Sequence, residues 1–324
     1  MKRRVLLVPI CIVLLLLVAA TILDPNGRLI GIARGEAFFQ GQPTSYWVSL
    51  LEEEVGSGEL KSSTIKTFDL DPRAVPVLKQ CLDFQSPDVR WAATRLLQHC
   101  GSYREQVSTF RSLLDDPVTR VRVEAICGLG NLRREALGAL AQLEELAYSD
   151  DDQITLAARY ALWSIDQSTA MRAEGWQDHE FPTFGFTARF PGNVRTDSRK
   201  AQRVDSDLHE FWTSLGPSRF TIVLTFVLPD VSTTVAERYD LAPIWAVENL
   251  GGTIDTSEEI TLGPYVGRDI RIITDGGFIL RTRLFIIKDR VYQAQAAYKP
   301  GLLHPDAVEH FLNSFRTIER RAES

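Results

Sequence analysis

Histidines and cysteines are the residues of this chain best suited to chemistry, and their spacing limits what they can do. The five histidines, which could bind a metal or move a proton near neutral pH, are His99, His179, His209, His304 and His310. None lies four residues from another or in a run with cysteine or aspartate at ligand spacing. His304 and His310 are six residues apart and would not face each other on a helix. We therefore expect no metal site.

Three of the four cysteines, Cys81, Cys100 and Cys127, fall within the helical repeats described below. Their odd number and the lack of any CxxC or Cys/His spacing indicate neither a disulfide framework nor a zinc site. Buried free thiols that pack as small hydrophobes and an oxidised Cys81–Cys100 pair both remain open. The acidic runs at 52–54 and 150–152 lack the oxygen spacing of a calcium loop, so we interpret them as a solvated helix face and a helix N-cap.

Sequence motifs of catalysis and of nucleotide binding are missing. The chain has no P-loop, no Rossmann glycine pattern after a strand, no GxSxG and no HExxH. We therefore expect no cofactor, no catalytic residue and no enzymatic activity. The formal net charge of −6 gives no basic excess for a phosphate backbone, which argues against a nucleic-acid partner. With 324 residues, 44% hydrophobic and 24% charged, the chain is of the globular class and has room for two domains.

The N-terminus has the composition of a membrane segment. Lys2-Arg3-Arg4 precedes an uncharged apolar run, Val5–Leu23, which as a helix is roughly 28 Å long and matches the core of a bilayer. The basic residues before the run and Asp24 after it predict a signal anchor over residues 1–24 with the N-terminus inside. A cleaved signal peptide with its site near Val18-Ala19-Ala20 is the alternative. Both interpretations export the rest of the chain across the cytoplasmic membrane of a bacterial-type cell.

The elements that follow are predicted to be helical. Residues 25–43, rich in glycine, form a connector, and Pro43-Thr44-Ser45 opens the first helix. A phrase then recurs at steps of 32 and 33 residues, as Val89–Ala93, Val121–Ala125 and Ile154–Ala158, each followed by a leucine (Leu97, Leu129 and Leu162). Such a period is typical of stacked helical pairs that bury their apolar faces only against one another. The sequence predicts an α-helical solenoid over 44–166.

With its D/S-P-x-V-R-x-x-A pattern, the segment 72–166 resembles HEAT repeats of the short, PBS-lyase-like kind. The third unit departs from the pattern because Thr155 replaces Arg90 and Arg122. The resemblance implies an armadillo-type scaffold that docks other proteins, and nothing in the sequence supports a lyase reaction. The candidate interaction residues are Arg90, Arg122, Trp91, Tyr46 and Trp47. For the two arginines, a bond to the turn of the neighbouring repeat is the alternative role.

After residue 180 the hydrophobic period changes from helical to strand-like. Strands are expected near 184–190, 208–215, 219–228, 253–262, 265–274, 278–288 and 291–298, with helices over 235–250 and from His304 onward. This order predicts an α+β domain over 181–318, whose antiparallel sheet is covered by helices on one side. Residues 167–180 are expected to form a polar linker.

The C-terminal domain resembles the PsbP-like α+β type through three short phrases. These are Phe190-Pro191-Gly192, Gly263–Arg268 and Phe311–Phe315. The resemblance implies an accessory or binding module without catalytic residues. Gly263 and Gly267 are expected to serve a bend or bulge at the start of the fifth strand.

Taken together, the sequence predicts a single-span, extracytoplasmic scaffold that binds an unidentified protein through the concave face of its helical array. One alternative is a binder of a small apolar or lipid ligand, held between sheet and helix by residues such as Phe220, Phe226, Trp245 and Tyr298. Another is an enzyme whose histidines and acids converge in a cleft.

Overall fold

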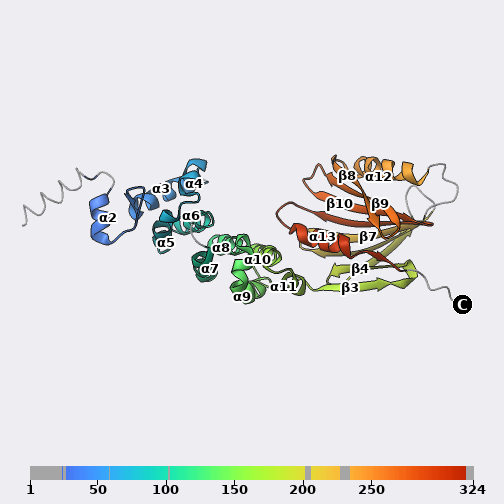
Figure 1. The fold of residues 1–324 in the computed structure, drawn as a ribbon, viewed down its shortest axis with the longest axis horizontal. Coiled ribbons are helices and arrows are strands. Elements are labelled where there is room, and N and C mark those ends of the chain that lie inside the picture. The colour runs from blue at the N-terminus through green and yellow to red at the C-terminus, as the bar shows by residue number, and fades with distance from the viewer. Residues whose placement is uncertain are drawn as a thin grey trace, which may run out of the picture. The chain divides into compact units, whose positions relative to one another are not determined.

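The structure, a computed structural model, describes residue 24 and residues 27–57, 59–100, 103–200, 206–226 and 234–318. The chain divides into two compact units, Met1–Ala161 and Leu162–Ser324 (Figure 1). The expected membrane segment, Val5–Leu23, lies outside the described residues. Within the described residues, no helix is both long enough and apolar enough to span a bilayer.

The first unit is a helical array. In chain order it comprises α2 (Arg28–Arg34), β1 (Phe38–Phe39), β2 (Gln42–Pro43), α3 (Thr44–Gly56), α4 (Ser62–Phe68), η1 (Pro72–Ala74), α5 (Val75–Leu82), α6 (Pro87–Leu97), α7 (Tyr103–Ser112), η2 (Leu113–Asp115), α8 (Thr119–Asn131), η3 (Arg133–Ala139), α9 (Leu140–Leu146) and the start of α10 (Asp152–Ile165). The expected connector over 25–43 contains the helix α2 and the hairpin β1–β2.

The recurring residues of the sequence form the core of this array. Eight repeat positions of this unit are buried, namely Val89, Val121, Ile154, Ala93, Ala125, Ala158, Leu97 and Leu129, and Leu162, the first residue of the second unit, is buried as well. Pro87 occupies the first turn of α6, where its missing N–H leaves no hydrogen bond unmade. The predicted helical repeat region is therefore confirmed.

The N-terminal end of the array is held by polar contacts to two buried or half-buried side chains. Gln80 Oε1 on α5 accepts hydrogen bonds from Ala37 N (2.7 Å) and Thr44 Oγ1 (2.6 Å), which fixes the β1–β2 hairpin and the start of α3 to α5. The buried Glu54 accepts from Lys61 N and Thr64 Oγ1 and so ties α3 to α4. Through these bonds, the polar groups at this end of the core have hydrogen-bond partners within the protein.

The second unit contains the end of α10, then α11 (Gln167–Ala173), β3 (Trp176–Phe181), η4 (Pro182–Phe184), β4 (Phe186–Pro191), β5 (Arg195–Lys200), β6 (Asp207–Leu215), β7 (Ser218–Phe226), α12 (Val235–Leu250), β8 (Thr253–Leu262), β9 (Tyr265–Ile273), β10 (Ile279–Ile287), β11 (Arg290–Tyr298), α13 (Pro305–Ser314) and β12 (Arg316–Thr317). The described strands form an antiparallel seven-stranded sheet, β5-β6-β7-β11-β10-β9-β8, and a three-stranded sheet, β12-β4-β3. The expected linker over 167–180 is instead α11 and most of β3, and β5 was not expected.

Helices cover both faces of the large sheet, so the expectation that they cover one side was wrong. Phe285 on β10 contacts Phe315, directly after α13, with 6.1 Å between ring centroids. On the opposite face, Arg268 of β9 bonds to Asp240 of α12 at 2.5 Å. Figure 1 shows α12 on one side of this sheet and α13 with β3 and β4 on the other. The core between the two sheets is aromatic and includes Phe186, Phe190, Phe211, Phe220, Phe311 and Phe315.

Tyr239 fixes α12 to the adjoining strands. The hydroxyl of Tyr239 donates to Val266 O (2.7 Å) and accepts from Ile286 N (2.8 Å). Because the β9–β10 pairing ends at the preceding pair, Gly267 and Phe285, the hydroxyl bridges the strands where they part. A single phenol therefore attaches the helix to the sheet and pairs backbone groups that the ladder leaves free.

The two glycines expected at a bend serve different purposes. Gly263 has φ +58° in the turn between β8 and β9, a conformation that suits glycine. Gly267 lies under the ring of Phe285, and a Cβ there would approach the ring to 2.4 Å and Leu284 O to 2.6 Å. The bulge of this strand pair lies elsewhere, between Ile254 and Thr256.

We expect Gly267→Ala to destabilise the second unit by about 1–3 kcal/mol, because an added methyl group overpacks a closed contact. Hydrogen exchange of β9 and β10, followed by mass spectrometry, measures the loss. The matched control is Gly56→Ala, where a Cβ meets nothing within 4 Å; it should leave protection in both units unchanged. Equal protection of β9 and β10 in the wild type and the Gly267 variant would contradict the packing argument.

Candidate interaction surface

Arg90, expected either to contact a partner or to join repeats, joins repeats in the structure. Its guanidinium donates two hydrogen bonds to Asp116, from Nε to Oδ2 (2.8 Å) and from Nη2 to Oδ1 (3.1 Å). Nη1 donates to Phe84 O and Gln85 O, in the turn before α6. The side chains of Arg90 and Asp116 are only 12% and 6% exposed. Arg90 therefore positions the next repeat, as bidentate arginine–carboxylate pairs do well.

Arg122 makes a looser version of the same link. It donates to Asp116 O and to Thr119 Oγ1, both at 3.1 Å, and lies 3.9 Å from Asp151. In the third repeat the hydroxyl of Thr155 donates to Ser149 O at 2.8 Å. Thr155 thus keeps a hydrogen bond to the turn, although it lacks the positive charge of the arginines in the first two repeats.

The electrostatics of Asp116 follow from this arrangement. Burial acts to raise the pKa of Asp116, but hydrogen bonds from Arg90 and from Val118 N, together with the charges of Arg90 and Arg122, outweigh it. The pKa of Asp116 therefore lies below its ordinary value. Its folded-state interactions stabilise the array above the pKa of the unfolded chain and are lost as the pH falls through the folded pKa.

A second set of contacts joins the outward sides of α6 and α8, which we call the array face. It comprises Asp88, Trp91, Arg95, Gln98, Arg120, Glu124, Cys127 and Asn131. Trp91 Nε1 donates to Glu124 Oε2 (3.1 Å), and the guanidinium of Arg120 lies 3.5 Å from the centre of the Trp91 ring. Gln98 donates to Glu124 Oε1 at 2.6 Å and accepts from Asn131 at 2.8 Å. These cross-repeat bonds hold the face in one arrangement.

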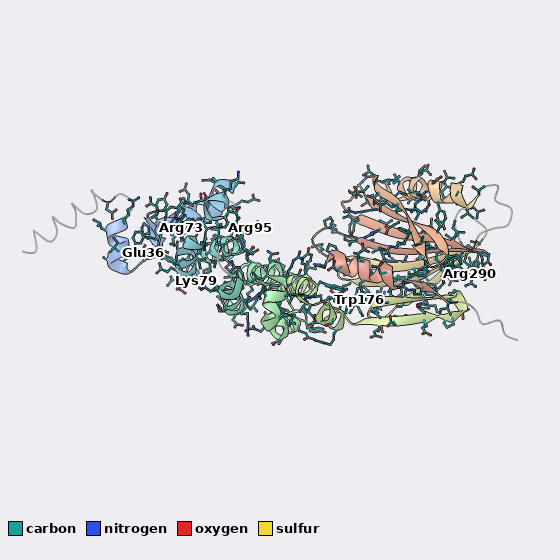
Figure 2. The ribbon with its side chains drawn as sticks, in the orientation of Figure 1. Glu36, Arg73, Lys79, Arg95, Trp176 and Arg290 are labelled. Carbon is teal, nitrogen blue, oxygen red and sulfur yellow. The ribbon has the colours of Figure 1, made fainter. Side chains whose placement is uncertain are left out.

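The array face also offers polar groups to a partner. About half of the side chain of each of Arg95, Arg120 and Asp88 is exposed, and Cys127 is exposed as well. Arg95 is labelled on α6 in Figure 2. Arg95 lies 3.8 Å from Glu124, and Arg120 lies 3.6 Å from Asp88. Ion pairs this exposed contribute little to stability, so both arginines are available for recognition.

The other expected contact residues have mixed positions. Trp47 is buried among Phe39 and Phe68, and its Nε1 donates to Phe39 O at 3.3 Å. Tyr46 is partly exposed and meets Trp47 edge-on at 5.3 Å. Trp91 is mostly covered by Arg120. Whether Tyr46, Trp47 or the repeat residues contact a partner stays a prediction.

Sequence reasoning did not single out Arg95, Arg120 or Glu124, although a signal was present. Asp88, Trp91, Arg95 and Gln98 follow one another at helical spacing, and Arg120, Glu124, Cys127 and Asn131 repeat that spacing about 32 residues later. Searching for polar residues in register between repeats, and not only for the apolar phrase, would have found the array face.

The cysteines behave as packing groups with one exception. Cys81 and Cys100 are free and buried, and burial raises the pKa of each thiol to about 12. The Cys100 thiol donates to Phe68 O (3.2 Å) and Leu96 O (3.0 Å). Both are therefore inert thiols in the structure, and a Cys81–Cys100 disulfide is not formed. Cys127 is also free but exposed.

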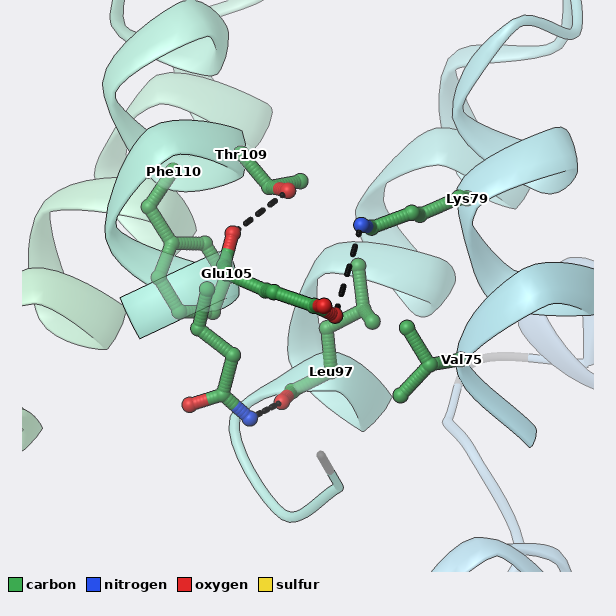
Figure 3. Close-up of a pocket in the computed structure, with 7 residues that line it drawn as sticks. Val75, Lys79, Leu97, Glu105, Thr109 and Phe110 are labelled. Atoms are coloured by element: carbon green, nitrogen blue, oxygen red, sulfur yellow. Dashed lines mark hydrogen bonds and ion pairs between the residues drawn. The ribbon is translucent and has the colours of Figure 1, made fainter. Parts of the chain in front are cut away.

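A small hollow lies beside α5, α6 and α7 (Figure 3). It is lined by Val75, Lys79, Leu97, Glu105, Gln106, Thr109 and Phe110, and Lys79 pairs with Glu105 at 3.8 Å. Its free volume is about 10 Å³, which is room for one water molecule. It is too small for an organic ligand.

Two of the residues expected to surround a ligand in the second unit, Phe220 and Trp245, lie on opposite faces of the large sheet. Phe220 is buried against Trp176 and Phe311. Trp245 is half-exposed on α12, which covers the opposite face of the sheet. Within the part of the chain that the structure describes, no three His, Cys, Asp or Glu side chains are grouped to hold a metal ion.

Comparison with known proteins supports the helical repeats. The family model described as HEAT repeats matches residues 70–163, and HEAT-repeat scaffolds are generally non-enzymatic and typically mediate protein–protein interaction. A search of curated proteins finds no match to the chain.

Among the solved structures that resemble part of the chain are two of low sequence identity. One is the solution structure of cyanobacterial PsbP from Synechocystis, which is 8% identical with a TM-score of 0.36; the matched region covers 44% of this chain and 93% of that one. A protein of unknown function from Pseudomonas aeruginosa is 13% identical with a TM-score of 0.23 and covers 39% and 83%. Likenesses this low carry no conclusion about function.

We expect Asp116→Asn to destabilise the array by about 3 kcal/mol near pH 7, because it leaves the largely covered side chain of Arg90 without its counter-charge. Urea unfolding of the two proteins, read by hydrogen exchange of α6 and α8, gives the difference. The gap should persist down to about pH 4 and shrink below it, as the wild-type carboxylate is protonated. A gap that is the same at pH 3 and pH 7 would rule out the charge as its cause.

Proposed function

We propose that this protein is a non-enzymatic scaffold, held in the cytoplasmic membrane by its N-terminal segment, that binds a protein partner on the outer side through the array face. The observation that carries the binding role is the bond lattice of the array face. Trp91, Gln98 and Glu124 are fixed across two repeats, while Arg95 and Arg120 remain half-exposed on top of them. A surface arranged in advance loses little conformational entropy on binding.

The chemistry of the array face also indicates what would fit it. Glu124 is largely covered and already bonded to Trp91 and Gln98, whereas the side chains of Arg95 and Arg120 are about half exposed. Guanidinium groups recognise planar carboxylates with paired hydrogen bonds. A partner segment that presents Asp or Glu side chains at helical or strand spacing is the best match.

The location rests on the sequence of the first 24 residues. The apolar run Val5–Leu23 has the length of a bilayer core, and the basic residues precede it. The signal-anchor form keeps the protein in the membrane with its bulk outside, whereas the cleaved form releases it. The intact mass of the mature protein purified from whole cultures distinguishes the two, since cleavage near Ala20 removes most of the run.

The binding role is tested by crosslinking the full-length protein in its native membrane and identifying captured proteins by mass spectrometry. We expect the double variant Arg95→Glu and Arg120→Glu to lose the captured partner at least tenfold, because both contacts become repulsive to carboxylates. The matched control, Lys66→Glu and Arg134→Glu, makes the same charge change at exposed sites outside the array face. Capture that is equal in both double variants and the wild type would show that the array face is not the binding surface.

A further inference from the structure

The short helix α2 exposes an apolar face to solvent. Of its seven residues, Arg28 to Arg34, all but Gly31 are exposed. Leu29, Ile30 and Ile32 are 56%, 38% and 66% exposed. A surface helix normally turns its apolar stripe toward the core and its polar side toward solvent. In α2 this order is reversed.

The residues of α2 divide cleanly around the helix axis. At about 100° per residue, Ile32, Leu29, Ala33 and Ile30 span an arc of roughly 160°. Arg28 and Arg34 lie on the two borders of this arc, and Gly31 lies opposite it. An apolar arc with basic residues at its borders is the pattern of helices that lie in a membrane interface, where arginine stems follow the apolar surface and their charges reach the headgroups.

Contacts to the rest of the array fix which way the arc points. A Cβ on Gly31 would lie 2.6 Å from Pro43 Cβ and 3.3 Å from the Phe38 ring, so the helix is in close contact with the β1–β2 hairpin through its one glycine. Directly after the helix, Glu36 N donates to Gly31 O and Glu36 Oε2 accepts from Ser45 N at 2.8 Å. Gln80 Nε2 also donates to Gly35 O. The helix is thus attached by its glycine side, and its apolar arc faces away from the protein.

The position of α2 in the chain identifies what lies against the arc. Leu23, the end of the apolar run, precedes Arg28 by five positions, a stretch that spans at most about 17 Å. The headgroup layer on each side of a bilayer is on the order of 5–8 Å thick. If the run is anchored as in the proposed function, on which this step rests, α2 cannot leave the neighbourhood of the outer headgroup layer.

We propose that α2 lies in the outer membrane interface with Ile32, Leu29, Ala33 and Ile30 among the lipid chains and with Arg28 and Arg34 at the phosphates. A helix of seven residues would adsorb weakly by itself. Attachment to the anchor makes its adsorption intramolecular, which raises its effective concentration at the surface. Because α2 packs on the hairpin through Gly31 and the residues directly after it, Gly35 and Glu36, bond to α5 and α3, its adsorption fixes the orientation of the array's N-terminal end on the membrane.

The test measures the depth of a spin label on full-length protein in vesicles of phosphatidylcholine and phosphatidylglycerol. Ala33→Cys carries the label within the apolar arc, in a background in which Cys11 and Cys127 are replaced by serine. Leu137→Cys, at an exposed apolar position on η3, is the matched control. We expect the label at 33 to collide with dissolved oxygen several-fold more than with a water-soluble nickel chelate, and the label at 137 to show the reverse.

Two further substitutions and a measurement of whether the protein floats with vesicles distinguish the possible outcomes of the test. Adding Leu29→Ser and Ile32→Ser should move the label at 33 from lipid into water. A label at 33 that favours the nickel chelate without these changes overturns the proposal, and one shielded from both reagents assigns the arc to a protein partner or a second copy instead. If the full-length chain does not float with vesicles, the anchor and this inference fall together. If the label lies in lipid but the array-face variant captures its partner normally, only the proposed binding role fails.

Discussion

The structure of the first unit depends on one constraint: no helical pair in this chain can bury its own apolar face. Each pair contributes a valine or isoleucine, an alanine and a leucine to a core that is closed only by the next pair. The neighbours must therefore be held at a fixed distance and angle. Alanine at 93, 125 and 158 allows the close approach, and the bidentate bond between Arg90 and Asp116 fixes the angle. The same bond occupies Arg90, so the proposed recognition surface consists of residues further along the helices.

In the second unit, charged side chains as well as apolar packing hold the elements in fixed positions. Asp269 on β9 accepts hydrogen bonds from Arg281 and Arg283 on β10, and these arginines also pair with Glu309 on α13. Burial acts to raise the pKa of Asp269, but the two arginines lower it below its ordinary value. A partly buried network of this kind stabilises the fold only when each of its charges has a partner. It therefore specifies where α13 sits on the sheet, next to the aromatic core around Phe311 and Phe315.

Two surfaces of the first unit have complementary roles in the proposed function. The N-terminal end turns Leu29 and Ile32 outward on a helix attached through Gly31, whereas α6 and α8 expose arginines over a bonded lattice. Apolar groups fit a lipid surface and guanidinium groups fit carboxylates. In the proposed function, this contrast lets one small array face both a membrane and a protein.

Much of the architecture could be predicted from local sequence, because periodicity reports directly on which residues must be buried. The step of 32 and 33 residues predicted the repeats, and strand-like alternation predicted β6 to β11 nearly to the residue. The stretch 167–180 was misread because its strand β3 is an edge strand of polar pattern, Trp176–Phe181, whose pairing with β4 is set by tertiary contact. The two faces of the sheet were assigned wrongly for the same reason, since α12 shows no strong apolar stripe and is placed by the hydroxyl of Tyr239.

The features of the candidate site also divide into those that the sequence predicted and those that only the structure placed. By itself the sequence determined the helical repeats, the sheet strands and the lack of a catalytic motif, since these depend on residue type and spacing along the chain. Only the tertiary structure decided that Arg90 is bonded inside the array, that Trp47 is buried and that Arg95 and Arg120 lie outward. Bonds between residues some 30 positions apart, such as Trp91 to Glu124 and Arg90 to Asp116, exist only once the repeats stack. The physical reason is that a polar side chain has no preferred partner until folding brings one within hydrogen-bonding distance.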